Sequence, residues 1–240
     1  MMSDNESPKG APISINSGVF DTNKGLSPEL ENLFKAEKVT GLPVIISGPS
    51  GVGKGTVVQE LLDEHKDTLI RSVSVTTRHP RVNEVDGVDY FFKTKEEFKE
   101  LIAQNQFLEY AVVFNDEFYG TPLFFFEENL KKGKDVILVI DVKGALEIKK
   151  TYKDGIYIFL LPPSLEELEM RLRDRKTEDD NAIKERLEKV KEELKMASHY
   201  DYLVINDIIK DTAFRLWAII IAEHLKTTRQ LKERKECQKE

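Results

Sequence analysis

The chain has 240 residues, of which 40% are hydrophobic and 33% charged, and its formal net charge is −7. This composition is typical of a globular protein with a substantial core, and the acidic balance argues against a broad surface for nucleic acid or anionic membranes. The single cysteine, Cys237, allows no internal disulfide and favours a reducing compartment. The sequence shows no targeting signal and no apolar run that could span a bilayer, so we expect a cytoplasmic protein without a membrane or nucleic-acid partner.

Residues 1–40 are predicted to form a flexible N-terminal extension, because most of them are polar and lack apolar periodicity. Within this extension, residues 26–37 carry a helix-start signal, with Ser27 in the capping position and Pro28 at the first helical position. The compact domain is expected at 41–230, and a polar tail at 231–240.

Strand patterns and helix patterns alternate from residue 41 onward. Apolar or alternating runs predict strands at 42–47, 71–77, 135–141, 155–161 and 202–206. Periodic segments predict helices at 54–65, 122–133, 142–153, 164–200 and 210–229. This alternation implies an α/β fold in which helices flank both faces of a parallel sheet.

One stretch departs from this alternation. Short strands such as DYFF and FLEYAVV surround a single predicted helix there, which indicates a small α+β lobe at 74–121. The core of the domain is then expected at 41–73, 122–165 and 200–230.

The segment SGPSGVGKGT at 47–56 joins the first predicted strand to the first predicted helix. Its glycines allow backbone N–H groups to point at phosphate oxygens, the helix start favours an anion, and Lys54 can reach the phosphates. The segment therefore predicts a phosphate-binding loop (P-loop) for ATP, with a tight strand-to-helix turn as the alternative. The ATP-binding candidates are Gly48, Pro49, Ser50, Gly51, Val52, Gly53, Lys54, Gly55 and Thr56, and Lys54 is also a catalytic candidate.

Gly55 departs from the usual loop pattern, which places a hydroxyl directly after the lysine to contact Mg²⁺. Thr56 follows one residue later, and one residue rotates a helical side chain by about 100°. Thr56 therefore does not simply replace the missing hydroxyl. We expect Mg²⁺ to be held mainly by the nucleotide phosphates and water.

A second motif, SVSVTTRHPRVNEVDGVDYFF at 72–92, resembles the guanylate-kinase signature S-x-x-T-T-R-x-P-R-x-x-E-x-x-G-x-x-Y. The resemblance covers roughly 42–225 and implies a nucleoside monophosphate kinase that transfers a phosphoryl group from ATP to GMP. It implies that Arg78, Arg81 and Tyr90 bind the GMP phosphate and that Arg78 also assists catalysis. Guanidinium forks suit a phosphate dianion, whereas a solvated charged loop is the alternative interpretation of the arginines alone.

The segment FLEYAVVFNDEFYGT at 107–121 resembles the family's F-x-E-x-A…YGT segment. The resemblance implies that Glu109 reads guanine and that Ser74, Tyr119 and Thr121 contact the base or its phosphate. A carboxylate can accept hydrogen bonds from N1–H and the N2 amino group of guanine, and adenine offers neither donor. Taken alone, Glu109 would be read as a surface strand residue.

The segment DVILVIDVKG at 135–144 resembles the family's L-D-I-D-x-Q-G, with Val139 and Lys143 at two altered positions. The retained Asp141 is implied to contact GMP, and a helix cap is the alternative. No firm metal ligand is assigned, and Thr56 and Asp141 are the candidates for contact through water.

The segment at 168–189 resembles the lid of these kinases, which sets a helical lid at about 166–199. Three lid arginines are implied to neutralise the transferring phosphoryl group, namely Arg171, Arg175 and Arg186, and the first two also bind ATP. A salt-bridged solvent helix is the alternative, because Glu167 and Arg171 are four residues apart. The resemblance also implies that Asn206 and Asp207 contact adenine.

These motifs together predict a guanylate kinase that uses ATP, GMP and Mg²⁺ and is a monomer, with a dimer as the second choice. Two other functions remain open at this point. Guanylate-kinase-like domains of scaffolds bind proteins without catalysis, but they typically have a degraded phosphate loop, whereas Lys54 and both signature arginines are kept here. A kinase for another monophosphate is disfavoured by Glu109 and the 72–92 motif.

Overall fold

The computed structural model describes residues 40–113, 116–173 and 180–236, all of which belong to the unit that follows Ala36. Residues 1–39 of the predicted N-terminal extension, with the helix expected at 26–37, and Arg175 lie outside the described residues. Among the helices of the described ranges, none has the length and apolar character needed to cross a membrane.

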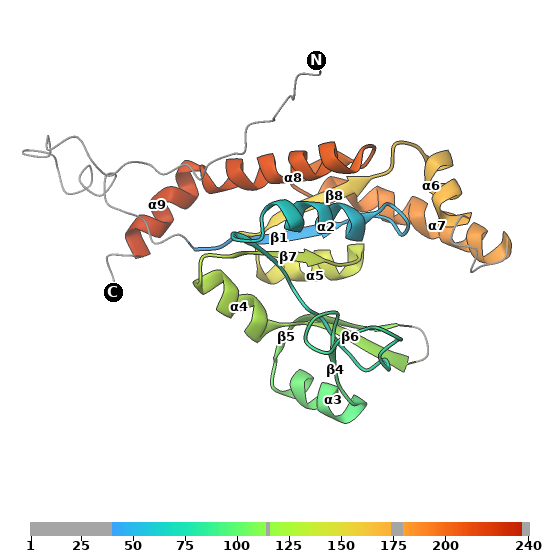
Figure 1. Cartoon of the computed structure of the whole chain (residues 1–240), viewed down its shortest axis with the longest axis horizontal. Coiled ribbons are helices and arrows are strands. Elements are labelled where there is room, and N and C mark those ends of the chain that lie inside the picture. The colour runs from blue at the N-terminus through green and yellow to red at the C-terminus, as the bar shows by residue number, and fades with distance from the viewer. Residues whose placement is uncertain (1–39, 114–115, 174–179, 237–240) are drawn as a thin grey trace, which may run out of the picture. The chain divides into compact units, whose positions relative to one another are not determined.

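Five parallel strands form the central sheet, in the order β2-β7-β1-β8-β9 (Figure 1). Their bounds are β1 Pro43–Ser47, β2 Leu69–Arg71, β7 Asp135–Val139, β8 Ile156–Leu161 and β9 Tyr202–Ile205. The middle strand β1 is buried along its whole length, as expected for a parallel strand covered on both faces. The predicted α/β fold with a parallel sheet is confirmed.

Helices cover both faces of this sheet (Figure 1). On one face, α2 (Lys54–Glu64) and α8 (Ile209–His224) pack their buried apolar side chains on the strands. On the other face, α4 (Leu123–Lys131) and α5 (Val142–Thr151) do the same. Burying an apolar stripe on each face removes it from water and fixes the ends of the strands in space.

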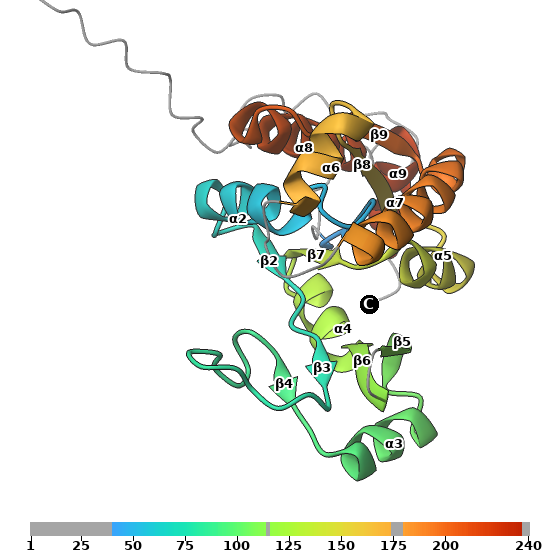
Figure 2. The same cartoon turned by 90° about the vertical axis from the view of Figure 1, so that its right-hand side faces the viewer.

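A second, four-stranded sheet has the order β4-β3-β6-β5 and carries helix α3 (Figure 2). Its elements are β3 Val75–Thr76, β4 Phe91–Phe92, α3 Lys95–Ala103, β5 Phe107–Val113 and β6 Glu117–Pro122. Strands β5 and β6 run antiparallel. Phe98 of α3 packs on Phe107 of β5, with 4.4 Å between ring centroids. These residues form the expected small lobe.

The strand predicted at 71–77 is two strands in two different sheets. Strand β2 ends in the central sheet, where the Ser72 amide still donates to the Ile137 carbonyl at 2.8 Å. Strand β3 pairs in the second sheet, where the Thr77 amide donates to the Phe118 carbonyl at 3.0 Å. The residues between them carry the chain from one sheet to the other, which an alternating pattern alone does not reveal.

The charged region predicted as one helix contains α6 (Leu165–Arg173), α7 (Asp180–Lys195) and the short 3-10 helix η3 (Met196–His199). The final helix also differs from its prediction, because α8 ends at His224 and the chain continues as α9 (Thr227–Glu236). The predicted polar tail at 231–240 is therefore helical as far as Glu236.

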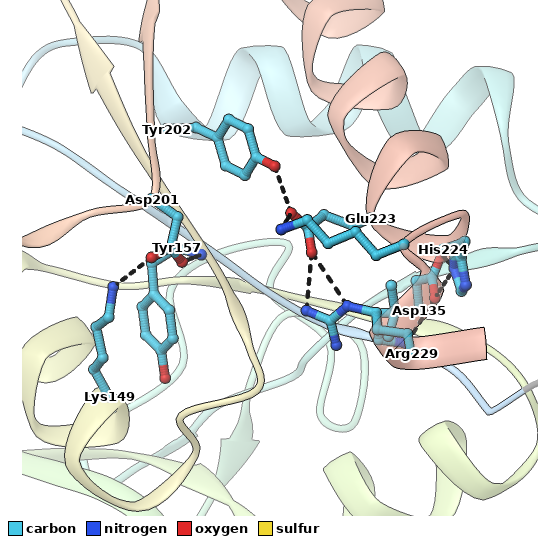
Figure 3. A network of polar contacts seen from close by, with 10 residues as sticks. Asp135, Lys149, Tyr157, Asp201, Tyr202, Glu223, His224 and Arg229 are labelled. Atoms are coloured by element: carbon cyan, nitrogen blue, oxygen red, sulfur yellow. Dashed lines mark hydrogen bonds and ion pairs between the residues drawn. The ribbon is translucent and has the colours of Figure 1, made fainter. Parts of the chain in front are cut away.

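A polar network ties these last helices to the amino ends of the central strands (Figure 3). The Glu223 carboxylate accepts hydrogen bonds from the Tyr202 hydroxyl and, at 3.0 and 3.1 Å, from Arg229. Asp135 accepts from the Leu42 amide at 2.7 Å and lies 2.9 Å from His224 Nε2. At this end of the sheet, the carboxylates of Glu223 and Asp135 therefore have hydrogen-bond partners within the protein.

Candidate active site

The phosphate loop follows the carboxyl end of β1, which is where ligand crevices form in open parallel sheets. Gly48, Gly51 and Gly53 have φ angles of 142°, 85° and 95°. A Cβ on Gly48 would lie 2.4 Å from the Leu160 carbonyl oxygen, and one on Gly53 would lie 2.7 Å from Asn206 Nδ2. Both the backbone conformation and the close packing therefore require glycine at these two positions.

Lys54, the first residue of α2, folds back across the loop. Its Nζ donates to the carbonyl oxygens of Gly48, at 2.6 Å, and Pro49, at 3.1 Å. The ammonium is therefore held over the curled backbone, beside the start of a helix whose partial positive charge also favours anions. This arrangement fits a phosphate chain lying in the loop.

Two side chains from distant segments support the loop through the Val52 carbonyl oxygen. Asn206 Nδ2 donates to it at 2.7 Å and Arg171 Nη1 at 3.3 Å. Arg171 also pairs with Glu167 at 3.0 Å, so the salt bridge considered as its alternative role exists beside its contact with the loop.

The remaining predicted residues of the ATP end are less closely grouped. Arg186 lies on α7, and Asp207 is exposed and pairs with Arg215 at 2.9 Å. Asn206 is buried and its amide is committed to the loop, so contact of Asn206 and Asp207 with adenine stays a prediction.

The predicted acceptor-phosphate residues meet in the second sheet. Arg78 Nε donates to the Tyr119 hydroxyl at 3.1 Å, and the guanidinium lies 5.4 Å from the centroid of the Tyr90 ring. Its Nη2 donates to both carboxylate oxygens of Glu84, and this hydrogen bond is the main cause that raises the pKa of Arg78. Arg81 is exposed three residues further on, so one loop presents both arginines.

Among the residues predicted to read guanine, Glu109 Oε1 accepts a hydrogen bond from Thr121 Oγ1 at 2.7 Å. Burial raises the pKa of Glu109, the Thr121 hydrogen bond opposes that rise, and the nearby charge of Asp141 adds to it. The Asp141 carboxylate caps α5 by accepting from the Gly144 amide at 2.8 Å, so the cap considered as its alternative role is observed. Ser74 is half-buried on the connection between β2 and β3.

The departures from the family pattern affect the surroundings of a metal ion. Beyond its own helix and chain neighbours, a Cβ added at Gly55 would meet no atom of the described residues within 4 Å. Val139 packs against the hydrophobic core at the end of β7. The described ranges hold no cluster of three or more His, Cys, Asp or Glu side chains arranged for a metal ion. Asp141 uses Oδ1 in the helix cap, and Thr56 is exposed, so these donors fit an ion that keeps its waters and nucleotide oxygens.

The guanylate kinase family model matches residues 40–223. The chain belongs to the guanylate kinase family. A guanylate kinase of Bacillus cereus is 50% identical over 197 residues, which cover 82% of this chain and 95% of the relative. A guanylate kinase of Bacillus subtilis is 47% identical over 192 residues, covering 80% and 94%. The crystal structure of guanylate kinase from Anaplasma phagocytophilum is 36% identical, covers 81% and 92% of the two chains, and has a TM-score of 0.65.

Two residues of this guanylate kinase site carried no role in the sequence interpretation. Glu84 binds Arg78, and its signal was the acidic position of the R-x-P-R-x-x-E signature. Gly144 lies against Glu109, because an added Cβ would be 3.2 Å from Glu109 Oε2. The sequence signal for Gly144 was a glycine three residues after Asp141, at the end of a strand. A side chain at this position would crowd the Glu109 carboxylate.

Proposed function

We propose that the chain catalyses the reaction of ATP with GMP to give ADP and GDP. The observation that carries this function is the half-buried Glu109 bonded to the buried Thr121, which offers a carboxylate to a base in a chain that also holds a phosphate loop with its lysine. Membership of the guanylate kinase family and about 50% identity to named guanylate kinases support it. The same likeness leaves the non-catalytic protein-binding domain disfavoured.

The proposed mechanism relies on positioning and charge. An oxygen of the GMP phosphate attacks the γ-phosphorus of ATP in line, and the bond from that phosphorus to the bridging oxygen of ADP breaks. Lys54, Arg171, Arg175 and Arg186 neutralise charge that spreads over the transferring group. Arg78, Arg81, Tyr90 and Tyr119 hold the acceptor phosphate so that the attack is effectively unimolecular.

We propose that Glu109 selects guanine. Its carboxylate is poorly satisfied before substrate binds, because burial disfavours its charge and the hydrogen bonds from Thr121 only partly offset that cost. The paired donors of guanine would complete its hydrogen bonding, while adenine would leave it stranded. Thr121 and Asp141 lie beside Glu109 at this end, the family resemblance assigns Ser74 to it as well, and Asp141 has Oδ2 available for a donor.

Mg²⁺ is proposed to enter with ATP. Asp141 and Thr56 would contact it through water, and the ion would supply charge neutralisation between the β- and γ-phosphates. The monomeric state stays a prediction from the sequence.

A coupled ADP-release assay with GMP, AMP, dTMP and UMP tests the function. We expect turnover with GMP that exceeds turnover with each other acceptor by orders of magnitude. Preference for AMP would contradict the proposed role of Glu109. Absence of turnover with every acceptor would contradict the proposed enzymatic activity and favour the protein-binding alternative.

A further inference from the structure

The Glu84 carboxylate lies at the centre of the loop that carries both signature arginines. It accepts two hydrogen bonds from Arg78 Nη2, at 2.8 and 2.9 Å, and a third from the Arg81 main-chain amide at 2.7 Å. The side chains of Arg78 and Glu84 are 11% and 18% exposed. This ion pair is therefore largely shielded, unlike an ordinary pair on the surface.

The contacts of Arg78 fix its guanidinium from three sides. Nε donates to the Tyr119 hydroxyl at 3.1 Å, Nη1 to the His79 carbonyl oxygen at 2.7 Å, and Nη2 to Glu84. A guanidinium has five N–H donors, so these bonds leave one donor on Nη1 for a ligand. Arg78 therefore meets an incoming phosphate in one prearranged orientation, which reduces the entropy lost on binding.

Glu84 also shapes the backbone on which Arg81 stands. Its own amide donates to the Arg81 carbonyl oxygen at 3.1 Å while its carboxylate accepts from the Arg81 amide, which closes a tight turn. Asn83, inside this turn, has a φ of 73°, a conformation that is costly for most residues and tolerated by Asn. The side chain of Glu84 thus stabilises a turn that the backbone alone would disfavour.

We propose that Glu84 is a positioning residue for the acceptor phosphate, acting through Arg78 and the turn at Arg81 without touching substrate. In an alternative role, Glu84 would only occupy Arg78 until an incoming phosphate displaced it. The hydrogen bond that Glu84 accepts from the Arg81 main-chain amide distinguishes the two roles. A phosphate can compete for the Arg78 guanidinium, but it does not replace the acceptor of a main-chain amide inside a closed turn. This inference rests on the proposed GMP kinase function.

Steady-state kinetics of Glu84→Gln test the proposal. The substitution keeps the shape and removes the charge, so we expect KM for GMP to rise about tenfold while kcat and KM for ATP stay within about twofold. Glu97→Gln is the matched control, because Glu97 is a carboxylate of the same lobe that caps α3 away from the arginines. It should leave all three constants unchanged.

A double-mutant cycle with Arg78→Lys separates positioning from a general effect on folding. If Glu84 acts through Arg78, Glu84→Gln should add much less to KM for GMP in the Arg78→Lys background than in the wild type. Additive effects would overturn the proposal, as would an unchanged or lowered KM for GMP in Glu84→Gln. A parallel loss for ATP and GMP would also overturn it.

Two further measurements keep the test decisive. Glu84→Asp retains the charge with a shorter reach, and we expect it to recover part of the loss, which a role of shape alone would not allow. Calorimetric titration of GMP covers the case in which turnover is too low to fit. A wild type without GMP turnover contradicts the proposed function, whereas normal wild-type turnover with an unaffected Glu84→Gln contradicts the inference alone.

Discussion

The two ends of the central sheet both gather carboxylates, but they satisfy them differently. At the amino end, burial would raise the pKa of Glu223, and hydrogen bonds from Lys226, Tyr202 and Arg229 outweigh it and lower that pKa (Figure 3). Beside the carboxyl end, burial of Glu109, on β5 of the second sheet, outweighs its hydrogen bonds from the side chain and main chain of Thr121, and the pKa of Glu109 is raised. The protein itself satisfies the hydrogen bonding of the Glu223 carboxylate, whereas the Glu109 carboxylate can still accept further hydrogen bonds.

This difference separates groups that hold the fold from groups that wait for a ligand. A buried charge with three donors stabilises the folded state relative to the same charge with none. A desolvated charge with too few donors reduces stability until a ligand supplies the others, which is a common cost of binding sites. Asn206 shows the same trait at the carboxyl end, because its Oδ1 is buried without a hydrogen-bond partner among the described residues.

Lys54→Ala should give the largest effect, because it removes the ammonium held over the phosphate loop. We expect kcat to fall by about 10³-fold, as when an electrostatic group is removed from a transition state, with little change in thermal stability. Single-turnover measurement of ADP formation checks this. Lys66→Ala is the control, since Lys66 is exposed and pairs only with Asp63 among the described residues. An equal fall in kcat in both variants would contradict a specific role for the lysine at the carboxyl end of the sheet.

Glu109→Gln should lower kcat/KM for GMP by about 10²-fold, because the amide offers a donor where guanine needs an acceptor. It should also raise the thermal midpoint at neutral pH. Since the folded-state pKa of Glu109 is raised, the cost of its charge is absent at low pH and appears as the pH rises through that pKa. The stability gain should therefore vanish as the pH falls below the ordinary pKa of Glu. Scanning calorimetry across pH checks the sign, and a destabilised variant at neutral pH would contradict it.

Glu223→Gln should act in the opposite way. We expect the free energy of unfolding to fall by about 2 kcal/mol, because the ion pair with Arg229 loses its charge while the side chain stays buried. Urea unfolding measures this loss, which should shrink as the pH falls, because a lowered pKa contributes stability only above it. The kinetic constants for GMP should not change, and a selective rise in KM for GMP would show that the amino end also serves binding.

Gly55→Ser should produce the smallest effect. Apart from its own helix backbone and chain neighbours, no atom of the described residues lies within 4 Å of an added Cβ, so the hydroxyl fits without displacing the loop. We expect the Mg²⁺ concentration for half-maximal activity to fall about threefold as one water is replaced by a protein ligand. Titration of activity with Mg²⁺ at fixed ATP checks this, with Gly55→Ala as the control that adds the Cβ alone. An unchanged Mg²⁺ requirement in Gly55→Ser would leave the hydroxyl without a role.

The sequence predicted local features well. The phosphate loop is contiguous, so its glycines, Lys54 and the following helix could be assigned from their spacing alone. The strands of the central sheet were also predictable, because continuous apolar runs suit burial on both faces. Their order in the sheet depends on contacts between distant segments, and no local pattern contains it.

Features that depend on tertiary contacts were missed or only partly predicted. The break between β2 and β3 is invisible to alternation, since both halves have strand character. Helix α9 has almost no apolar stripe, and its start is held by Arg229 bonding back to Glu223. The contact of Glu84 with Arg78 depends on the turn between them, which forms only in the folded loop.

The contrast between the two ends of the sheet is tested most directly by calorimetric titration of GMP into Glu109→Gln and Glu223→Gln at neutral pH. We predict that Glu109→Gln, although folded and more stable, loses most of its GMP affinity, while Glu223→Gln, although less stable, binds GMP like the wild type. Normal GMP binding by Glu109→Gln, or weakened binding by a folded Glu223→Gln, would contradict the division between a binding end and a structural end.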